Sequence, residues 1–222
     1  MVISLYSISH EPLPMFLLRR YLSYVSESCK DKITKLKRWQ DVNNGILARV
    51  LLLEGLKRYG HNLNWLPPIN YGLHHKPYIA LDVEFNISHS DNMVICALSD
   101  EGTIGVDIEK IKAVAISDFN FQFSSKELHD INLSQNPLRE FYRYWTKKEA
   151  VIKADGRGLN IPLNNINVLQ NSGSIFLDTQ WYLYELPIDN EYVGHVAVPA
   201  ELTHDLKVDY VDLTSVPYPL LS

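Results

Sequence analysis

One stretch decides the fold class of this 222-residue chain: FNISHSDNMVICALSDEGTIGVDIEK, from Phe85 to Lys110. Two polar groups inside it, Asp91-Asn92 and Asp100-Glu101-Gly102, have the composition of turns and divide it into three runs. The middle run, Met93 to Leu98, is apolar at every position, which is typical of a strand covered on both faces. We therefore predict an antiparallel meander of three strands in a sheet on which a helix packs.

Helical periodicity occurs on both sides of this stretch. Apolar residues recur at helical spacing from Asp41 to Tyr59, and Gly60 suits the position just after a helix. The same pattern returns from Pro137 to Ala154 and ends near Gly156. Strand patterns are present at 2–8, 166–170, 174–178, 181–186 and 192–198.

The order of a helix followed by a meander thus occurs twice. This order predicts an α+β fold of two similar lobes, 1–102 and 103–222, in which a long helix packs on a small, mainly antiparallel sheet. No Gly/Ser-rich linker separates the lobes, so we expect one rigid two-lobe unit.

Composition excludes several classes of protein. The 21 basic and 26 acidic residues give a net charge of −5, which argues against a sequence-independent nucleic-acid binder. No apolar run is long enough for a membrane span and the N-terminus does not resemble a signal peptide, so we expect a cytoplasmic protein without a membrane partner. Cys29 and Cys96 lack the spacing of a disulfide framework or a zinc site, which is consistent with a reducing compartment.

Two neighbouring carboxylates stand out in the third run. Strand alternation directs Val106 and Ile108 to the core, whereas Asp107 and Glu109 share the opposite face. Side by side, they repel each other, and a hard divalent cation such as Mg²⁺ relieves that repulsion. A solvated strand face is the alternative, and for an isolated pair of this kind it is the commoner outcome.

The second long helix carries a further set of candidates. Trp145, Glu149 and Lys153 are four residues apart and line one helical face. The alternative for Glu149 and Lys153 is a surface ion pair that contributes little stability. Gly156 and Gly158 allow a sharp turn after the helix, so that the chain returns toward the same region.

The first run of the opening stretch adds polar residues. Asn86, Ser88 and Ser90 are two apart on the strand, and His89 comes at its end beside a turn. A strand-end histidine is more often structural than catalytic, so a structural role for His89 remains the alternative.

Together and in this order, these stretches resemble the Sfp-type 4′-phosphopantetheinyl transferases. Those enzymes have K-P, then F-N-x-S-H-S, then G-[IV]-D-[IV]-E, then W-[ST]-x-K-E-[AS]-x-x-K-x-x-G-x-G-L. This chain fills every signature position at 76–77, 85–90, 105–109 and 145–159, and the likeness covers roughly 30–200. Ala150 after Glu149 places the chain nearer the W/KEA branch of the family.

The resemblance implies a pseudo-twofold α+β fold with coenzyme A bound between the lobes. Asp107, Glu109 and Glu149 would then ligate Mg²⁺, and Lys153 would contact the pyrophosphate. Further contacts with coenzyme A would come from His89 and Ser88 at phosphate oxygens, from Lys76 and Pro77 beside the adenine, and from a basic group at the 3′-phosphate: Lys30, Lys32, Lys35, Lys37 and Arg38. A solvated helix face is the alternative for that basic group.

Two positions depart from the family pattern. Family members often have Arg before the small residue that here is Gly45, whereas this chain has Asn44; His75 stands where Gly precedes Lys-Pro. Both positions lie near the expected nucleotide pocket, where Tyr71, His74 and His75 are candidates to compensate.

The implied reaction transfers the 4′-phosphopantetheine arm of coenzyme A to a serine of an acyl or peptidyl carrier protein and releases 3′,5′-ADP. Glu149 is the candidate general base, and Lys153 would stabilise charge on the bridging oxygen. We expect a monomer that binds coenzyme A and an apo carrier protein. The alternatives are a Mg²⁺-dependent hydrolase that cleaves the pyrophosphate of coenzyme A or a nucleotide, and an inactive coenzyme A-binding protein.

Overall fold

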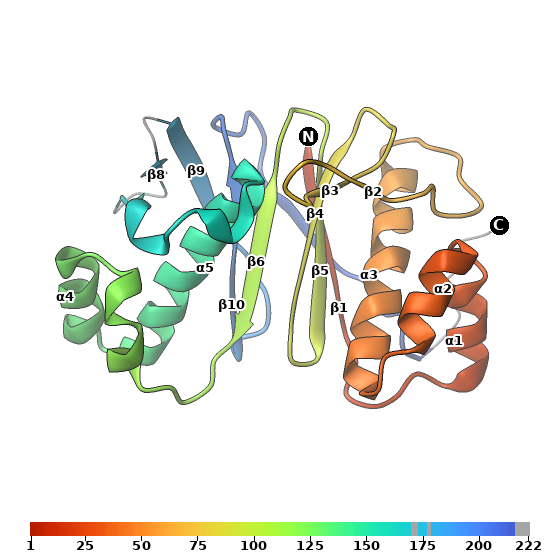
Figure 1. Cartoon of the computed structure of the whole chain (residues 1–222), viewed down its shortest axis with the longest axis horizontal. Coiled ribbons are helices and arrows are strands. Elements are labelled where there is room, and N and C mark those ends of the chain that lie inside the picture. The colour runs from red at the N-terminus through yellow and green to blue at the C-terminus, as the bar shows by residue number, and fades with distance from the viewer. Residues whose placement is uncertain (170–172, 177–178, 216–222) are drawn as a thin grey trace.

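Two β-sheets meet at the centre of the molecule, and a long helix packs on the far side of each (Figure 1). The computed structural model describes residues 1–169, 173–176 and 179–215. The first sheet has the order β11-β1-β5-β4: Lys207–Tyr210, Val2–Ile8, Met93–Ser99 and Glu84–Ser90. The second has the order β6-β10-β9-β8-β7: Gly105–Lys110, Tyr192–Val198, Thr179–Glu185, Gly173–Phe176 and Asn167–Val168. A short hairpin pairs β2 (Asn70–Tyr71) with β3 (Pro77–Tyr78).

The helices divide between the two sheets. Helix α3 (Trp39–Arg58) packs on the first sheet, and α1 (Met15–Leu22) and α2 (Glu27–Thr34) pack on α3. Helix α5 (Pro137–Asp155) packs on β6 and β10, and α4 (Ser125–Leu133) packs on α5. Three short 3₁₀ segments, Ile116–Gln122, Gly158–Asn160 and Leu163–Asn165, connect these elements. The predicted α+β class is confirmed.

Local sequence signals set the bounds of the two long helices. Helix α3 ends at Arg58, close to the predicted end, and Gly60 has the positive φ of 85° that glycine adopts easily. Helix α5 ends at Asp155, and Gly156 follows in the left-handed conformation with φ 85°. The chain therefore turns sharply at the end of α5, as its sequence predicts.

The predicted three-stranded meander is wrong in its third strand. Strands β4 and β5 pair as expected, but β5 pairs next with β1, and β6 pairs with β10 in the second sheet. In place of backbone hydrogen bonds between neighbouring strands, side chains of β4 accept hydrogen bonds from the backbone of β6. The N–H of Val106 donates to Asn86 Oδ1 at 3.0 Å, and the N–H of Ile108 donates to Ser88 Oγ at 3.3 Å.

The chain end also departs from the predicted division into lobes. Strand β11 pairs in parallel with β1, and Val211 and Leu213 are buried in the cluster around α3. The last described residues of the predicted lobe 103–222 therefore pack in the first half of the fold. Of the predicted strands 166–170 and 174–178, residues 170 and 177–178 lie outside the described residues. In the described residues, no helix combines the length and apolarity needed to cross a membrane.

Strand β6 and helix α5 approach each other unusually closely. A Cβ atom on Gly105 would lie 2.1 Å from the carbonyl oxygen of Ala150 and 2.3 Å from the backbone nitrogen of Ala154. The face of β6 that carries Gly105 and Asp107 is therefore covered by α5, and only 4% of Asp107 is exposed. The solvated-face alternative for Asp107 is wrong, because a helix and not water covers this face.

Candidate active site

Three sequence stretches that are far apart in the chain meet in one open pocket of about 350 Å³. Strand β6 contributes Asp107 and Glu109, and α5 contributes Glu149 and Lys153. The remaining lining residues are Trp145 of α5 and Ile87, Ser88 and His89 of β4. The close contact at Gly105 thus brings the helical face that carries Glu149 and Lys153 onto the two strand carboxylates.

Asp107 is the buried centre of this pocket. Its Oδ1 accepts hydrogen bonds from Lys153 Nζ at 2.7 Å and from Ser88 Oγ at 3.0 Å. Its Oδ2 is buried and has no hydrogen-bond partner among the described residues. Burial raises the pKa of Asp107, and the Lys153 charge opposes that rise. Because Lys153 bonds to Asp107, the surface-ion-pair alternative with Glu149 is wrong.

Glu109 and Glu149 complete the acidic side of the pocket. Ser90 Oγ donates to Glu109 Oε2 at 2.6 Å. Burial raises the pKa of both glutamates, and the charge of Asp107 raises each further. The three carboxylates therefore repel one another in a region partly withdrawn from water.

This donor set fits a hard cation in its chemistry. Carboxylate oxygens are the ligands that Mg²⁺ takes in proteins, and the unpaired Oδ2 of Asp107 is a buried oxygen that needs a partner. In the described part of the chain, however, no three His, Cys, Asp or Glu side chains are grouped closely enough to hold a metal ion. Lys153 lies against Asp107 instead, so the ligand set Asp107, Glu109 and Glu149 remains a prediction.

Ser88 and His89 occupy different depths of the pocket. Ser88 is buried; besides its bond to Asp107, its hydroxyl accepts from Lys153 Nζ at 3.0 Å. In this arrangement the Ser88 hydroxyl orients Asp107 and Lys153. His89 is exposed at the rim, and the pKa of its ring is lowered by partial desolvation and then by the Lys153 charge.

Lys76 and Pro77 line an adjoining pocket of about 180 Å³ that shares Lys153 with the first. Lys76 Nζ donates to the carbonyl oxygen of Ala154 at 3.0 Å, and burial lowers the pKa of this amine. This bond ties the residue before strand β3 to the end of α5. His75, also in this pocket, has a φ of 62°, a left-handed conformation that glycine adopts more easily. The loop therefore keeps a backbone suited to glycine although the residue is His.

Lys32 lines a third pocket, between α2, α3 and the loop before β2. Its Nζ lies 5.9 Å from the centre of the Tyr71 ring. Lys30 instead pairs with Glu27 at 2.5 Å on the surface of α2. The other basic candidates, Lys35, Lys37 and Arg38, line none of these three pockets.

Two contributors were not predicted as site residues, although Ser90 was noted as a polar residue of its strand. Ser90 holds Glu109 much as Ser88 holds Asp107, and the two-residue spacing on both strands was the signal for this match. Lys148, beside Glu149, is fully buried; its Nζ donates to Glu127 Oε2 at 2.7 Å and to the carbonyl oxygens of Gln122 and Leu163. Lys148 therefore anchors α5 to α4, and no local sequence signal distinguishes it from a surface lysine.

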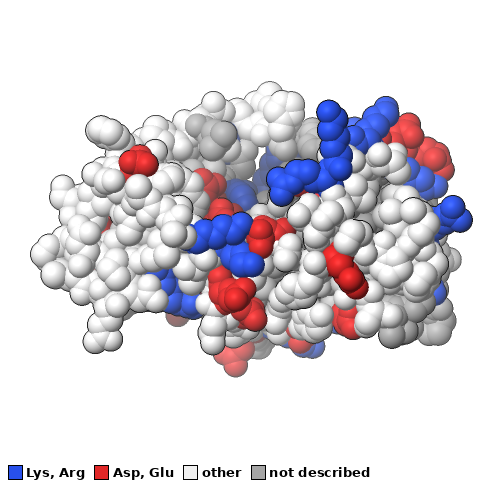
Figure 2. Space-filling view, turned by 90° about the horizontal axis from the view of Figure 1, so that it is seen from below, with Lys and Arg blue, Asp and Glu red and all other residues white. Residues whose placement is uncertain are grey.

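Charged side chains are unevenly spread over the molecule. Figure 2 shows lysine and arginine gathered on the half that holds α1 to α3, and basic and acidic side chains mixed near the middle of the face. The end over α4 shows few charges in this view. A local basic region therefore exists despite the net charge of −5.

Comparison with known proteins gives one consistent result. Residues 103–197 match the model of the 4′-phosphopantetheinyl transferase superfamily. The chain is 31% identical over 203 residues to the 4′-phosphopantetheinyl transferase Sfp of Bacillus subtilis strain 168, a match that covers 83% of this chain and 88% of that protein. Another 4′-phosphopantetheinyl transferase of Bacillus subtilis is 32% identical over 72% of this chain and 73% of its own length. AcpT of Escherichia coli K12 is 36% identical over 47% of this chain and 56% of its own.

Proposed function

This chain belongs to the 4′-phosphopantetheinyl transferase superfamily, and we propose that it transfers the 4′-phosphopantetheine arm of coenzyme A to a serine of an acyl or peptidyl carrier protein. The observation that carries this proposal is the meeting of Asp107, Glu109, Glu149 and Lys153 in one pocket. The carboxylates would hold Mg²⁺ that neutralises a pyrophosphate, Glu149 can accept a proton, and Lys153 can stabilise a leaving oxygen. Such a reaction requires all three functions.

The acidic side of the pocket has two roles in this proposal. Asp107, Glu109 and Glu149 would hold Mg²⁺, which when bound supplies positive charge to the pyrophosphate oxygens. Glu149 accepts the proton of the attacking serine, directly or through a water molecule. Its place in the wall of the open pocket and its raised pKa suit a general base.

Lys153 acts on the leaving group. The serine oxygen forms a bond to the β-phosphorus of coenzyme A while the bond from that phosphorus to the bridging oxygen breaks. The electron pair of the broken bond stays on that oxygen, and 3′,5′-ADP leaves. Lys153 Nζ is held beside Asp107 by Ser88 and offers its charge to the bridging oxygen.

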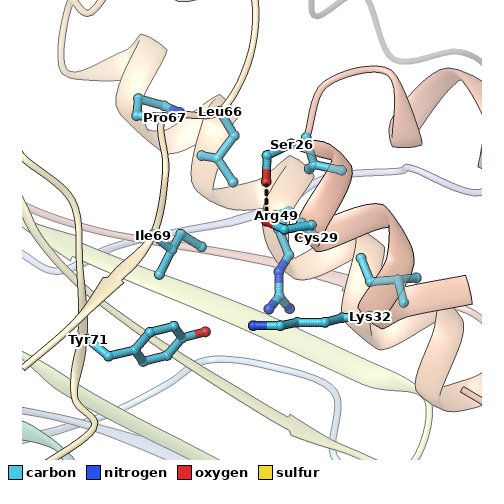
Figure 3. Close-up of a pocket in the computed structure, with 11 residues that line it drawn as sticks. Ser26, Cys29, Lys32, Arg49, Leu66, Pro67, Ile69 and Tyr71 are labelled. Carbon is cyan, nitrogen blue, oxygen red and sulfur yellow. Dashed lines mark hydrogen bonds between the residues drawn. The ribbon is translucent and has the colours of Figure 1, made fainter. Parts of the chain in front are cut away.

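The remaining proposed contacts follow the pockets. His89 at the rim would meet a phosphate of coenzyme A, and Ser88 would act there through Asp107 and Lys153. Lys76 and Pro77 would border the adenine, and Lys32 would contact the 3′-phosphate in the pocket drawn in Figure 3. We place the reaction in the cytoplasm, with a monomeric enzyme.

Transfer is tested by incubating the protein with coenzyme A, Mg²⁺ and a panel of apo carrier proteins and measuring the intact mass of each carrier. The expected result is the mass gain of one phosphopantetheine arm. Glu149→Gln retains the size of the side chain but accepts no proton, so kcat should fall about 100-fold or more while coenzyme A binding weakens less.

Glu140→Gln is the matched control, because Glu140 is on the same helix but does not line the pocket. Wild-type activity in Glu149→Gln would show that Glu149 is not the general base. Release of free phosphopantetheine with every carrier unmodified would favour the hydrolase instead.

A further inference from the structure

Strand β4 is joined to strand β6 by a row of polar side chains, Asn86, Ser88 and Ser90. Each side-chain oxygen accepts a hydrogen bond from the backbone N–H of the residue twenty positions later, over 3.0 to 3.3 Å. The donors are Val106, Ile108 and Lys110. Because the offset is the same at all three positions, the row fixes the register of β6 against β4.

The hydroxyl of Ser90 makes a second hydrogen bond, to the carboxylate of Glu109. Its Oγ donates to Glu109 Oε2 at 2.6 Å, while the N–H of Lys110 donates to the same Oγ at 3.0 Å. A serine hydroxyl has a single proton, and here that proton is directed to the carboxylate. The backbone of β6 therefore fixes the position of the Ser90 hydroxyl, and the hydroxyl fixes one oxygen of Glu109.

The residue types along β4 follow the carboxylates of β6. Nineteen positions after Ser88 and Ser90 come Asp107 and Glu109, the carboxylates to which the two hydroxyls donate. Nineteen positions after Asn86 comes Gly105, which has no side chain. A serine thus stands opposite each carboxylate of this row, and an amide stands where there is none. The serine hydroxyls therefore orient the carboxylates as well as joining the strands.

The carboxylate pocket, which is lined by Asp107, Glu109 and Glu149, contains one carboxylate without such support. Glu149 comes from α5, and its pKa is raised by burial and then by the charge of Asp107, with no hydrogen bond contributing. In the described part of the chain, serines thus hold two of these carboxylates and not the third. This division suits the two tasks in the proposed reaction, because ligands keep a fixed geometry whereas a base must accept a proton.

We propose that Ser90 is a positioning residue whose hydroxyl holds Glu109 in the orientation in which that carboxylate binds the divalent cation. The proposal rests on the proposed function. Hydrogen bonds orient metal-binding carboxylates, and loss of such a partner typically lowers metal affinity about 10- to 100-fold. Ser88 makes the same contact with Asp107 but also bonds to Lys153, so its replacement would disturb two charged groups. Ser90 acts through Glu109 alone and gives the cleaner test.

The test measures how coenzyme A affinity depends on Mg²⁺, by titration calorimetry in EDTA and at a series of Mg²⁺ concentrations, without a carrier protein. In Ser90→Ala, the Mg²⁺ concentration that gives half of the gain in affinity should rise about 10- to 100-fold. The affinity in EDTA should stay as in the wild type, and so should the kcat of transfer at saturating Mg²⁺. Ser90→Thr retains a hydroxyl and should restore the wild-type Mg²⁺ dependence.

Two controls show whether the effect passes through Glu109. Ser99→Ala removes a buried hydroxyl that accepts the backbone N–H of Glu101 at 3.1 Å but does not line the carboxylate pocket, so it should behave as the wild type. In a Glu109→Gln background, Ser90→Ala should shift the Mg²⁺ dependence no further, because the group on which Ser90 acts is already changed. Melting curves in EDTA identify any variant that does not fold. Should Ser90→Ala not fold, Ser90→Cys makes the same test with a weak donor.

The outcomes separate this proposal from the proposed function. An unchanged Mg²⁺ dependence in folded Ser90→Ala would overturn the positioning role, and so would an equal loss of coenzyme A affinity in EDTA and in Mg²⁺. A wild type whose coenzyme A affinity does not respond to Mg²⁺ would overturn it as well. A Mg²⁺ dependence that requires Ser90, in a protein that modifies no carrier, would support the role of Ser90 and contradict the proposed function.

Discussion

Replacing Gly105 by Ala tests how the close contact between β6 and α5 builds the site. The added Cβ would lie 2.1 Å from the Ala150 carbonyl oxygen and 2.3 Å from the Ala154 nitrogen, and both atoms belong to the main chain of α5. A rotamer change cannot relieve such a contact, so the helix must move away from the strand by about 1 Å.

The free-energy cost of that movement depends on how much of the helix and of its contacts must shift. Overpacked cores usually lose about 1–3 kcal/mol, and here the clash involves the backbone of a 19-residue helix. We therefore expect the free energy of unfolding to fall by about 3 kcal/mol or more. The same shift would stretch the 2.7 Å contact between Lys153 and Asp107, so transfer activity should fall even in molecules that remain folded.

Urea denaturation of the wild type and of Gly105→Ala measures the loss of unfolding free energy. Carrier-modification rates at a temperature where both proteins are folded measure the loss of transfer activity. Gly45→Ala is the control for the same chemical change. Gly45 lies within helix α3, and a Cβ there would meet Ile33 Cγ1 of α2 at an ordinary 3.5 Å, so stability should rise by up to about 1 kcal/mol. A Gly105→Ala variant within about 0.5 kcal/mol of the wild type would refute the packing argument.

Three further predictions concern single positions. His75→Gly should raise the free energy of unfolding by about 1 kcal/mol, because His75 has φ 62°, whereas His74→Gly should not raise it; thermal melts compare the two. Burial keeps the pKa of His195 well below its usual range, so below about pH 6.5 the unfolded chain binds a proton that the folded protein does not. Stability should then fall by up to about 1.4 kcal/mol per pH unit on acidification, and urea titrations should show a flatter profile for His195→Gln. Lys148→Met should lose about 3–5 kcal/mol by leaving Glu127 buried without its cation, and the double variant with Glu127→Gln should recover part of that loss; equal stabilities of the single and double variants would contradict this account.

Local patterns in the sequence were sufficient for the two long helices, for most strands of the two sheets and for the candidate residues that the carboxylate pocket gathers. Helical spacing predicted both long helices nearly to their ends, because apolar periodicity and the glycines after them act over a few residues. Strand alternation placed Asp107 and Glu109 on one face of β6, and four-residue spacing placed Glu149 and Lys153 on one face of α5. Both pairs line the same pocket. The resemblance in the motifs agrees with the family that the comparisons show.

Tertiary structure alone decided which partners these faces meet. The sequence does not reveal that β6 leaves its neighbour β5 for the second sheet, because strand patterns are the same in either sheet and the choice depends on side chains of β4 that bind the β6 backbone. Nor does it reveal that Lys153 bonds to Asp107 rather than to Glu149 one turn away, or that Lys148 is fully buried. Local propensity acts along the chain, whereas burial and charge pairing depend on residues brought together from distant positions, and only the folded chain determines those contacts.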